Sequence, residues 1–121
     1  CTKEEELDGV TAISGSGPAY VFRCMEALTE AGLRYGFNDV QAKRMAIATV
    51  LGSAELAKRS GESPSILREK VTSKGGTTYE ALKVMNDRHF MEMMQDAMDA
   101  CKKRAVELGD AFHESVEAAE K

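Results

Sequence analysis

Residues 88–112 read RHFMEMMQDAMDACKKRAVELGDAF, and this stretch decides the fold class. Its apolar residues recur at steps of three and four, which is the period of an amphipathic helix. The resulting stripe comprises Phe90, Met94, Ala97, Cys101, Leu108 and Phe112, and Met98 and Ala105 widen it. A helix of this span is roughly 35–40 Å long, whereas a compact chain of this size has a radius of gyration near ~14 Å. Because one small domain can hardly cover such a stripe, we expect a homodimer or a higher oligomer.

Helical signals continue upstream of this stretch. Ser16 or Gly17 is suited to cap a helix that has Pro18 at its first position and stops at Gly36. Asn38 restarts the pattern as an N-cap, and the apolar face that follows ends at Ser60-Gly61. The small residues of this second helix either allow a neighbouring helix to approach closely or simply favour helix formation.

Two shorter helices lie between these and the final one. Ser63-Pro64 opens a helix that reaches about Val71. Thr77 and Glu80 have the spacing of a capping box, so Thr77 is the expected cap of a helix that breaks near residues 86–87. Residues 7–13 are either extended or a helical turn. Since no stretch alternates convincingly as a strand, the predicted class is all-α, with about five helices.

The composition of the chain excludes several classes of function. With 121 residues the chain is sized for a single domain over residues 1–121, and its net charge of −4 argues against nucleic-acid or anionic-membrane binding. No apolar run is long enough to span a membrane, and the acidic start is unlike a signal peptide. The three cysteines form no Cys-x-x-Cys motif, which favours a reducing cytoplasm, and Cys24 and Cys101 are expected as small core residues. The two histidines lack ligand-like neighbours, so no metal site is expected.

The first glycine-rich stretch, Gly15-Ser16-Gly17-Pro18-Ala19-Tyr20, begins like a dinucleotide fingerprint. Its sixth position is Tyr20 where that fingerprint requires glycine, and no second strand ending in an acidic residue follows. A tight backbone approach combined with a helix cap explains the stretch better. A dinucleotide site is therefore not expected at this stretch.

The second stretch, Ser73-Lys74-Gly75-Gly76-Thr77-Thr78, has the outline of an anion site. Two glycines let successive N–H groups face one point at the start of a helix, where the helix dipole is positive. The hydroxyls of the stretch add further hydrogen-bonding groups. Such a cradle suits a small carboxylate or phosphate, although an ordinary loop entering a helix has the same spacing.

Residues 11–20 (TAISGSGPAY) and 71–78 (VTSKGGTT) closely resemble the two signature stretches of Δ1-pyrroline-5-carboxylate reductases. The resemblance extends over roughly residues 7–110 and concerns only the C-terminal, helical dimerisation half of that family. It implies that the N-terminal Rossmann domain is missing from this chain and that Cys1 is a cut point. No cofactor is then expected on this chain, and the chain alone is expected to be inactive.

The resemblance further implies that the full-length enzyme reduces the C=N bond of 1-pyrroline-5-carboxylate with NADPH or NADH to give L-proline. Its active site forms where the dinucleotide domain meets the partner subunit's loop. The substrate carboxylate is expected on the Ser73 hydroxyl and on the N–H groups of Gly75, Gly76 and Thr77. Thr78 is the expected catalytic residue, which orients the ring nitrogen for hydride attack.

Three further positions carry weaker expectations. Glu62 either lines the same site or is an ordinary surface or capping carboxylate. Lys74 stands where the family often has proline, and Lys70 where it often has a polar amide, so the role of each is open. The competing hypothesis is a helical dimer without enzymatic activity that senses a small anion with the same loop.

Overall fold

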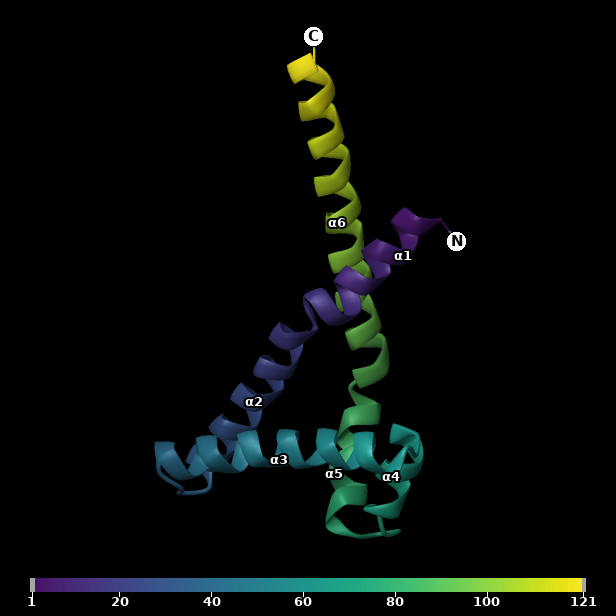
Figure 1. Ribbon diagram of the computed structural model, residues 1–121. Coiled ribbons are helices and arrows are strands. Elements are labelled where there is room, and N and C mark those ends of the chain that lie inside the picture. The colour runs from purple at the N-terminus through teal and green to yellow at the C-terminus, as the bar shows by residue number, and fades with distance from the viewer. Residues whose placement is uncertain (1, 121) are drawn as a thin grey trace. The chain divides into compact units, whose positions relative to one another are not determined.

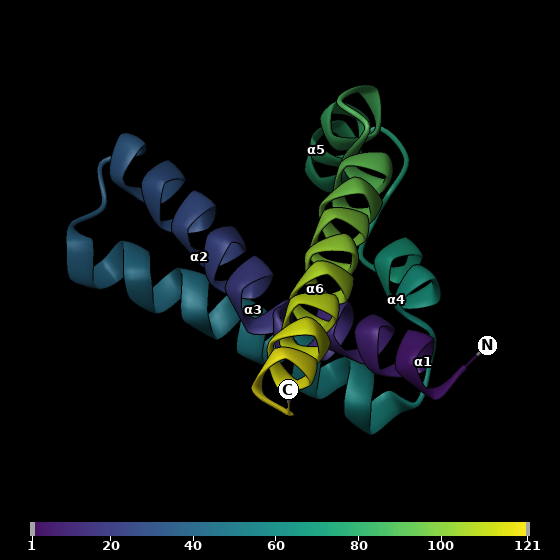
Figure 2. The same ribbon diagram turned by 90° about the horizontal axis from the view of Figure 1, so that it is seen from above.

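The computed structural model describes residues 2–120, so Cys1 lies outside the described part (Figures 1 and 2). The described residues are helical almost throughout, which confirms the all-α prediction. Within residues 2–120, six α-helices and one π-helical turn follow one another. Contacts divide the described residues into two units, one from residues 2–19 and 89–120 and the other from residues 20–88. That the two units form one domain stays a prediction.

The first unit begins with α1 (Lys3–Val10), which settles the alternative left open for residues 7–13. Thr2 caps this helix in a capping box, in which its hydroxyl accepts from the Glu5 N–H at 3.2 Å and its own N–H donates to the Glu5 carboxylate at 3.1 Å. The π-helical turn η1 (Thr11–Gly15) follows without a break, and the Ser16 N–H donates to the Thr11 carbonyl at 2.8 Å. The first signature stretch therefore folds as a wide helical turn.

The final helix, α6 (Phe90–Glu120), belongs to the same unit and contacts both η1 and α1. It starts two residues later than the pattern suggested, because His89 has a left-handed φ of 59°. It also continues past residue 112, since helix-forming Ala and Glu residues follow the apolar stripe. At about 1.5 Å per residue its 31 residues span roughly 46 Å, so the predicted long helix is confirmed and extended.

The second unit contains α2 (Gly17–Arg34) from Tyr20 onward, together with α3 (Asp39–Ser60). Gly36, with φ 97°, ends α2 as predicted, and the N–H groups of Gly36 and Phe37 donate to the carbonyls of Leu33 and Gly32. This is the Schellman pattern that favours glycine. At the other end Gly17 opens α2, so Pro18 occupies its second position, where the sequence suggested the first.

Both predicted ends of α3 are confirmed. The Asn38 side chain accepts from the Gln41 N–H at 2.9 Å, and the Gln41 side chain accepts from the Asn38 N–H at 3.1 Å. Gly61 follows the last residue with a φ of 68°. Reciprocal capping at one end and a left-handed glycine at the other fix the length of this helix.

The backbones of α2 and α3 approach each other closely at Gly32. A Cβ atom on Gly32 would lie 2.9 Å from the Ala42 Cβ and 3.3 Å from its Cα, and Ala42 and Ala46 are buried. At this end of α3 the small residues therefore allow α2 and α3 to approach each other closely. Farther along α3, Gly52 and Ala54 are exposed, so packing within the unit does not explain them.

Two short helices complete the second unit. The helix α4 (Pro64–Lys70) begins at the predicted proline. The helix α5 (Thr77–Asp87) has Gly76 at its N-cap, so the prediction that Thr77 caps it is wrong. Thr77 is already helical, which places Glu80 one position too far along for a capping box. The glycine adopts the extended cap backbone and leaves the cap without a side-chain hydrogen bond.

Large apolar side chains remain exposed in both units. Among the described residues the buried apolar side chains are alanines: Ala12, Ala42 and Ala46. Phe22 is 60% exposed, Leu51 57% and Phe112 66%, and Cys24 is exposed where a core residue was expected. Cys101 is half-buried in the first unit, where its thiol donates to the Ser16 hydroxyl at 3.2 Å. Apolar faces of this extent are typical of surfaces that bind another chain.

None of the helices within residues 2–120 has the length and apolar character that crossing a membrane requires.

Candidate anion-binding site

The segment between α4 and α5 carries the second signature stretch, and a tight turn shapes it. The Gly76 N–H donates to the Ser73 carbonyl at 2.9 Å, and Gly75 between them has a φ of 77°. A left-handed third residue in a four-residue turn is typical of type II, and glycine meets that requirement without strain. We call residues 73–78 the signature loop.

Gly76 is needed for a second reason, which is close approach. A Cβ atom at this position would lie 2.7 Å from the Ser73 Oγ and 3.1 Å from the Ser73 carbonyl oxygen. The absence of a side chain therefore lets the Ser73 hydroxyl rest directly against the cap of α5. The turn brings a hydroxyl group to the point where the α5 backbone amides begin.

The first amides of α5 are available to a ligand. The first N–H that finds a backbone acceptor is that of Glu80, which donates to the Gly76 carbonyl at 3.2 Å. The N–H groups of Thr77, Thr78 and Tyr79 precede it and have no acceptor inside the helix. No side chain caps α5, and the positive end of its dipole lies at the same place. This combination attracts an anion.

The structure redistributes the roles expected within the signature loop. Ser73 and Thr77 are exposed and Thr78 is half-buried, so the hydroxyls of the loop lie around the start of α5. The Gly76 amide, expected as a ligand donor, is engaged by the Ser73 carbonyl. In this conformation it shapes the turn, and the amides of Gly75, Thr77, Thr78 and Tyr79 are the ones left for a ligand.

Glu62 and Lys70 form an ion pair at the two ends of α4. The Lys70 ammonium lies 2.5 Å from the Glu62 carboxylate, and the Glu62 N–H donates to the Ser60 hydroxyl at 3.2 Å. Among the described residues no hydrogen bond joins Glu62 to the signature loop. Its observed contact braces α4, and its expected place in the site stays a prediction.

Lys74 occupies the second position of the turn, where its side chain is exposed. Within residues 2–120 it forms no ion pair. It places one uncompensated positive charge on the signature loop. Because both an anion-attracting amide cluster and this charge lie on the same six residues, the loop is electrostatically suited to a negatively charged ligand.

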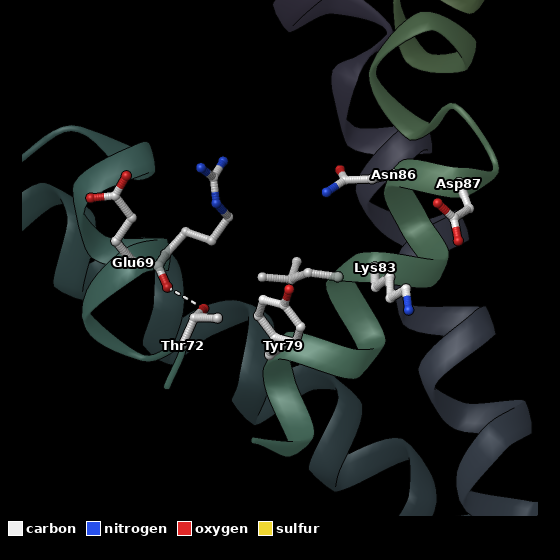
Figure 3. A pocket seen from close by; sticks show the side chains of 8 residues that line it. Glu69, Thr72, Tyr79, Lys83, Asn86 and Asp87 are labelled. Atoms are coloured by element: carbon white, nitrogen blue, oxygen red, sulfur yellow. Dashed lines mark hydrogen bonds between the residues drawn. The ribbon is translucent and has the colours of Figure 1, made fainter. Parts of the chain in front are cut away.

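A groove of about 400 Å³ opens between α4 and α5, beside the signature loop (Figure 3). Its lining residues are Arg68, Glu69, Thr72, Tyr79, Leu82, Lys83, Asn86 and Asp87. None of the six residues of the loop lines it, although Thr72 and Tyr79 are the loop's immediate neighbours. The sequence interpretation did not identify this groove. The spacing of Tyr79, Leu82 and Asn86 along one helix face was the available signal.

Two features of the described residues bear on cofactor and metal binding: the first glycine-rich stretch and the placement of the metal-ligating side chains. Residues 15–20 lie in η1, the bend after it and the start of α2, so the strand–loop–helix context of a dinucleotide fingerprint is missing there. This stretch does not fit a dinucleotide. Within residues 2–120 no group of three or more His, Cys, Asp or Glu side chains is placed to hold a metal ion.

Comparisons with known proteins all point to the same family. The family model described as "Pyrroline-5-carboxylate reductase dimerisation" matches residues 4–108. The pyrroline-5-carboxylate reductase of Pseudomonas aeruginosa is 41% identical over 107 residues, which are 88% of this chain and 39% of that protein. That of Synechocystis is 42% identical over 106 residues, or 88% of this chain and 40% of that protein. The chain thus spans about two-fifths of the length of these relatives.

Solved structures agree with the sequence relatives. The pyrroline-5-carboxylate reductase of Coxiella burnetii superposes with a TM-score of 0.84 at 41% identity, over 89% of this chain and 40% of that one. The pyrroline carboxylate reductase of Plasmodium falciparum, solved with NADP bound, gives a TM-score of 0.81 at 33% identity, over 86% of this chain and 40% of that one. The chain therefore belongs to the pyrroline-5-carboxylate reductase family and comprises the region by which that family dimerises.

Proposed function

We propose that this chain is the dimerisation and substrate-binding half of a pyrroline-5-carboxylate reductase. The complete enzyme would reduce the C=N bond of 1-pyrroline-5-carboxylate to give L-proline. One observation carries the proposal: in a chain of this family, the signature loop leaves the start of α5 without a side-chain cap. The substrate has a carboxylate that such a helix end can hold.

The signature loop binds the substrate carboxylate. The Ser73 hydroxyl and the N–H groups of Gly75 and Thr77 donate to its oxygens, and the Thr78 N–H is a further donor at the same helix end. Hydrogen bonds to a charged group contribute about 1.5–3 kcal/mol each, which makes this the main anchor of the ring. The Lys74 charge adds attraction at longer range, and this contribution falls with added salt.

Thr78 orients the reacting bond. Its half-buried side chain follows the amide cluster by one residue, so a ring held through its carboxylate places the imine nitrogen near the Thr78 hydroxyl. A threonine hydroxyl is too weak an acid at neutral pH to serve well as a general acid. Its contribution is therefore a hydrogen bond that fixes the ring plane for attack at the imine carbon.

NADPH or NADH, bound elsewhere in the complete enzyme, would supply the hydride. The residues of this chain hold the ring and leave one face of the imine open to that donor. The carbon of the C=N bond gains the hydride and the nitrogen gains a proton, which gives the secondary amine of proline.

The working form is a homodimer. The exposed apolar side chains of both units need a partner, and a second copy supplies a matching apolar surface. Cys24 and Cys101 are both free thiols, as expected for a protein that works in a reducing compartment such as the cytoplasm.

A chimeric reductase tests the proposal. The N-terminal part of the Pseudomonas aeruginosa enzyme is joined to this chain in place of its own matching region, and NAD(P)H oxidation is followed with 1-pyrroline-5-carboxylate. We expect turnover by the chimera and a fall in kcat/KM of about tenfold or more in Thr78→Ala, from the loss of an orienting hydrogen bond. Its stability should change by less than about 0.5 kcal/mol.

The control is Thr49→Ala, which removes an exposed threonine hydroxyl from α3 that bonds only the Met45 carbonyl one turn back. This variant should keep the full rate. A folded, dimeric chimera without activity would favour the anion-sensing alternative, and an unchanged rate in Thr78→Ala would remove Thr78 from the mechanism.

A further inference from the structure

The groove between α4 and α5 has the features of a binding site that the function proposed above leaves unused. Its volume of about 400 Å³ lies in the range of small-molecule pockets, roughly 300–1,000 Å³. It lies wholly within the second unit, since every lining residue falls between residues 68 and 87.

Helix periodicity builds the α5 wall. Tyr79, Leu82 and Asn86 are spaced three and four residues apart, so their side chains share one face. Figure 3 shows the Tyr79 hydroxyl and the Asn86 carboxamide turned toward the open centre, whereas Lys83 and Asp87 lie toward the outer side of α5. The wall thus offers one hydrogen-bonding group on each side of the apolar Leu82.

The last turn of α4 builds the opposite wall. Thr72 closes this turn because its hydroxyl donates to the Arg68 carbonyl at 2.5 Å, which fixes the backbone that carries the Arg68 side chain. The guanidinium of Arg68 forms no ion pair within residues 2–120, unlike those of Arg23 and Arg104. It keeps all of its N–H donors for a ligand.

We propose that this groove binds a small organic monocarboxylate. The Arg68 guanidinium pairs with the carboxylate through two parallel hydrogen bonds, a geometry that favours arginine over lysine. The Tyr79 hydroxyl and the Asn86 carboxamide satisfy the remaining polar atoms, and Leu82 contacts the hydrocarbon part. Among the lining residues Glu69 and Asp87 balance the charges of Arg68 and Lys83, so the groove has no excess positive charge for a dianion, and inorganic phosphate is disfavoured.

An occupied groove would restrain both ends of the signature loop. Thr72 precedes Ser73 and Tyr79 follows Thr78, so a ligand that touches both holds the two residues at which the loop joins the helices. Arg68 and Asn86 belong to the groove alone, and the proposal therefore stands whether or not the loop binds a substrate.

An amide NMR titration of the 121-residue chain with isobutyrate tests this site. We expect saturable shifts confined to residues 68–72 and 79–87 and a dissociation constant in the millimolar range. Arg68→Gln should weaken binding tenfold or more while the spectrum outside the groove is unchanged. The matched control is Lys58→Gln, which removes an exposed positive charge from α3 and should leave the affinity as it is.

Four results would overturn the proposal: shifts that never saturate, equal binding of the neutral isobutyramide, equal or tighter binding of inorganic phosphate, or equal losses in Arg68→Gln and Lys58→Gln. If Arg68→Gln does not fold, Asn86→Ala replaces it and should weaken binding severalfold. In Ser73→Ala the groove shifts should persist. Their disappearance would mean that isobutyrate binds the signature loop, and would count against the groove without touching the function proposed for that loop.

Discussion

At the residue scale, the two glycines of the signature loop are constrained in different ways. Gly75 adopts a φ of 77°, at which a side chain would cost roughly 1–2 kcal/mol. Gly76 has an ordinary φ of −85°, and its constraint is the 2.7 Å that would separate a Cβ from the Ser73 Oγ. Substitution at Gly76 therefore displaces the Ser73 hydroxyl and also crowds the Ser73 carbonyl oxygen, which would lie 3.1 Å from the new Cβ.

Gly76→Ala should consequently lower kcat/KM of the chimeric reductase by about tenfold, since the Ser73 hydroxyl is moved away from the carboxylate. Gly109→Ala is the matched control because a Cβ there meets nothing within 4 Å in the middle of α6. It should leave the rate unchanged and raise the free energy of unfolding by about 0.5–1 kcal/mol. Equal effects of the two substitutions on kcat/KM would show that the Ser73 hydroxyl does not contribute to substrate binding.

The anion site stays a prediction from the sequence, and the structure shows that one of its expected donors, the Gly76 amide, bonds within the loop. The order of hydroxyls and glycines predicted an anion cradle at a helix start, and the uncapped start of α5 is consistent with that prediction. The engagement of the Gly76 amide by the Ser73 carbonyl could not be predicted, because the sequence does not state which turn type the loop adopts. The Arg68 groove was missed because residues from two helices form it.

At the element scale, local signals determine most helix ends. Asn38 with Gln41 and the left-handed Gly36 and Gly61 act within a few residues, so sequence alone places these boundaries. Other ends differ from the sequence prediction, and two of them are informative. Thr77 and Gly76 can both precede a helix, and the turn at Ser73 selects Gly76. The end of α6 was placed at residue 112 because the apolar stripe ends there, whereas helix propensity carries the helix to Glu120.

The approach of α2 to α3 makes Gly32 sensitive to substitution. Gly32→Ala places a methyl group 2.9 Å from the Ala42 Cβ and should lower the free energy of unfolding by about 1–3 kcal/mol. Urea titration followed by circular dichroism measures this change. Gly52→Ala, on an open part of α3, should instead be neutral or stabilising by up to about 1 kcal/mol. A loss of stability in both variants would show that close approach is not the cause.

At the scale of the whole molecule, exposed apolar surface is the dominant feature. Side chains such as Phe22, Leu51 and Phe112 are more than half exposed, and in both units the buried side chains are small. Burial stabilises by about 25 cal/mol per Å² of apolar surface, so covering these faces with a second copy adds substantially to the stability of each chain. The periodicity of residues 88–112 predicted a partner, and the match to the family's dimerisation region supports self-association.

Light scattering after size-exclusion chromatography should therefore give a dimer or a larger assembly at micromolar concentration. The melting temperature should rise with protein concentration, because association stabilises the folded state by mass action. A monomer whose melting temperature is independent of concentration would contradict the argument from the long helix.

The measurement that most directly tests the central claim is competition by L-proline and L-prolinamide in the chimeric reductase. The two molecules differ only in the group that the signature loop should recognise. We predict that L-proline competes with the substrate, that L-prolinamide competes poorly, and that Ser73→Ala raises the inhibition constant of L-proline by about tenfold or more. Equal inhibition by the two molecules, or an inhibition constant for L-proline that Ser73→Ala leaves unchanged, would contradict the claim that this loop holds the carboxylate.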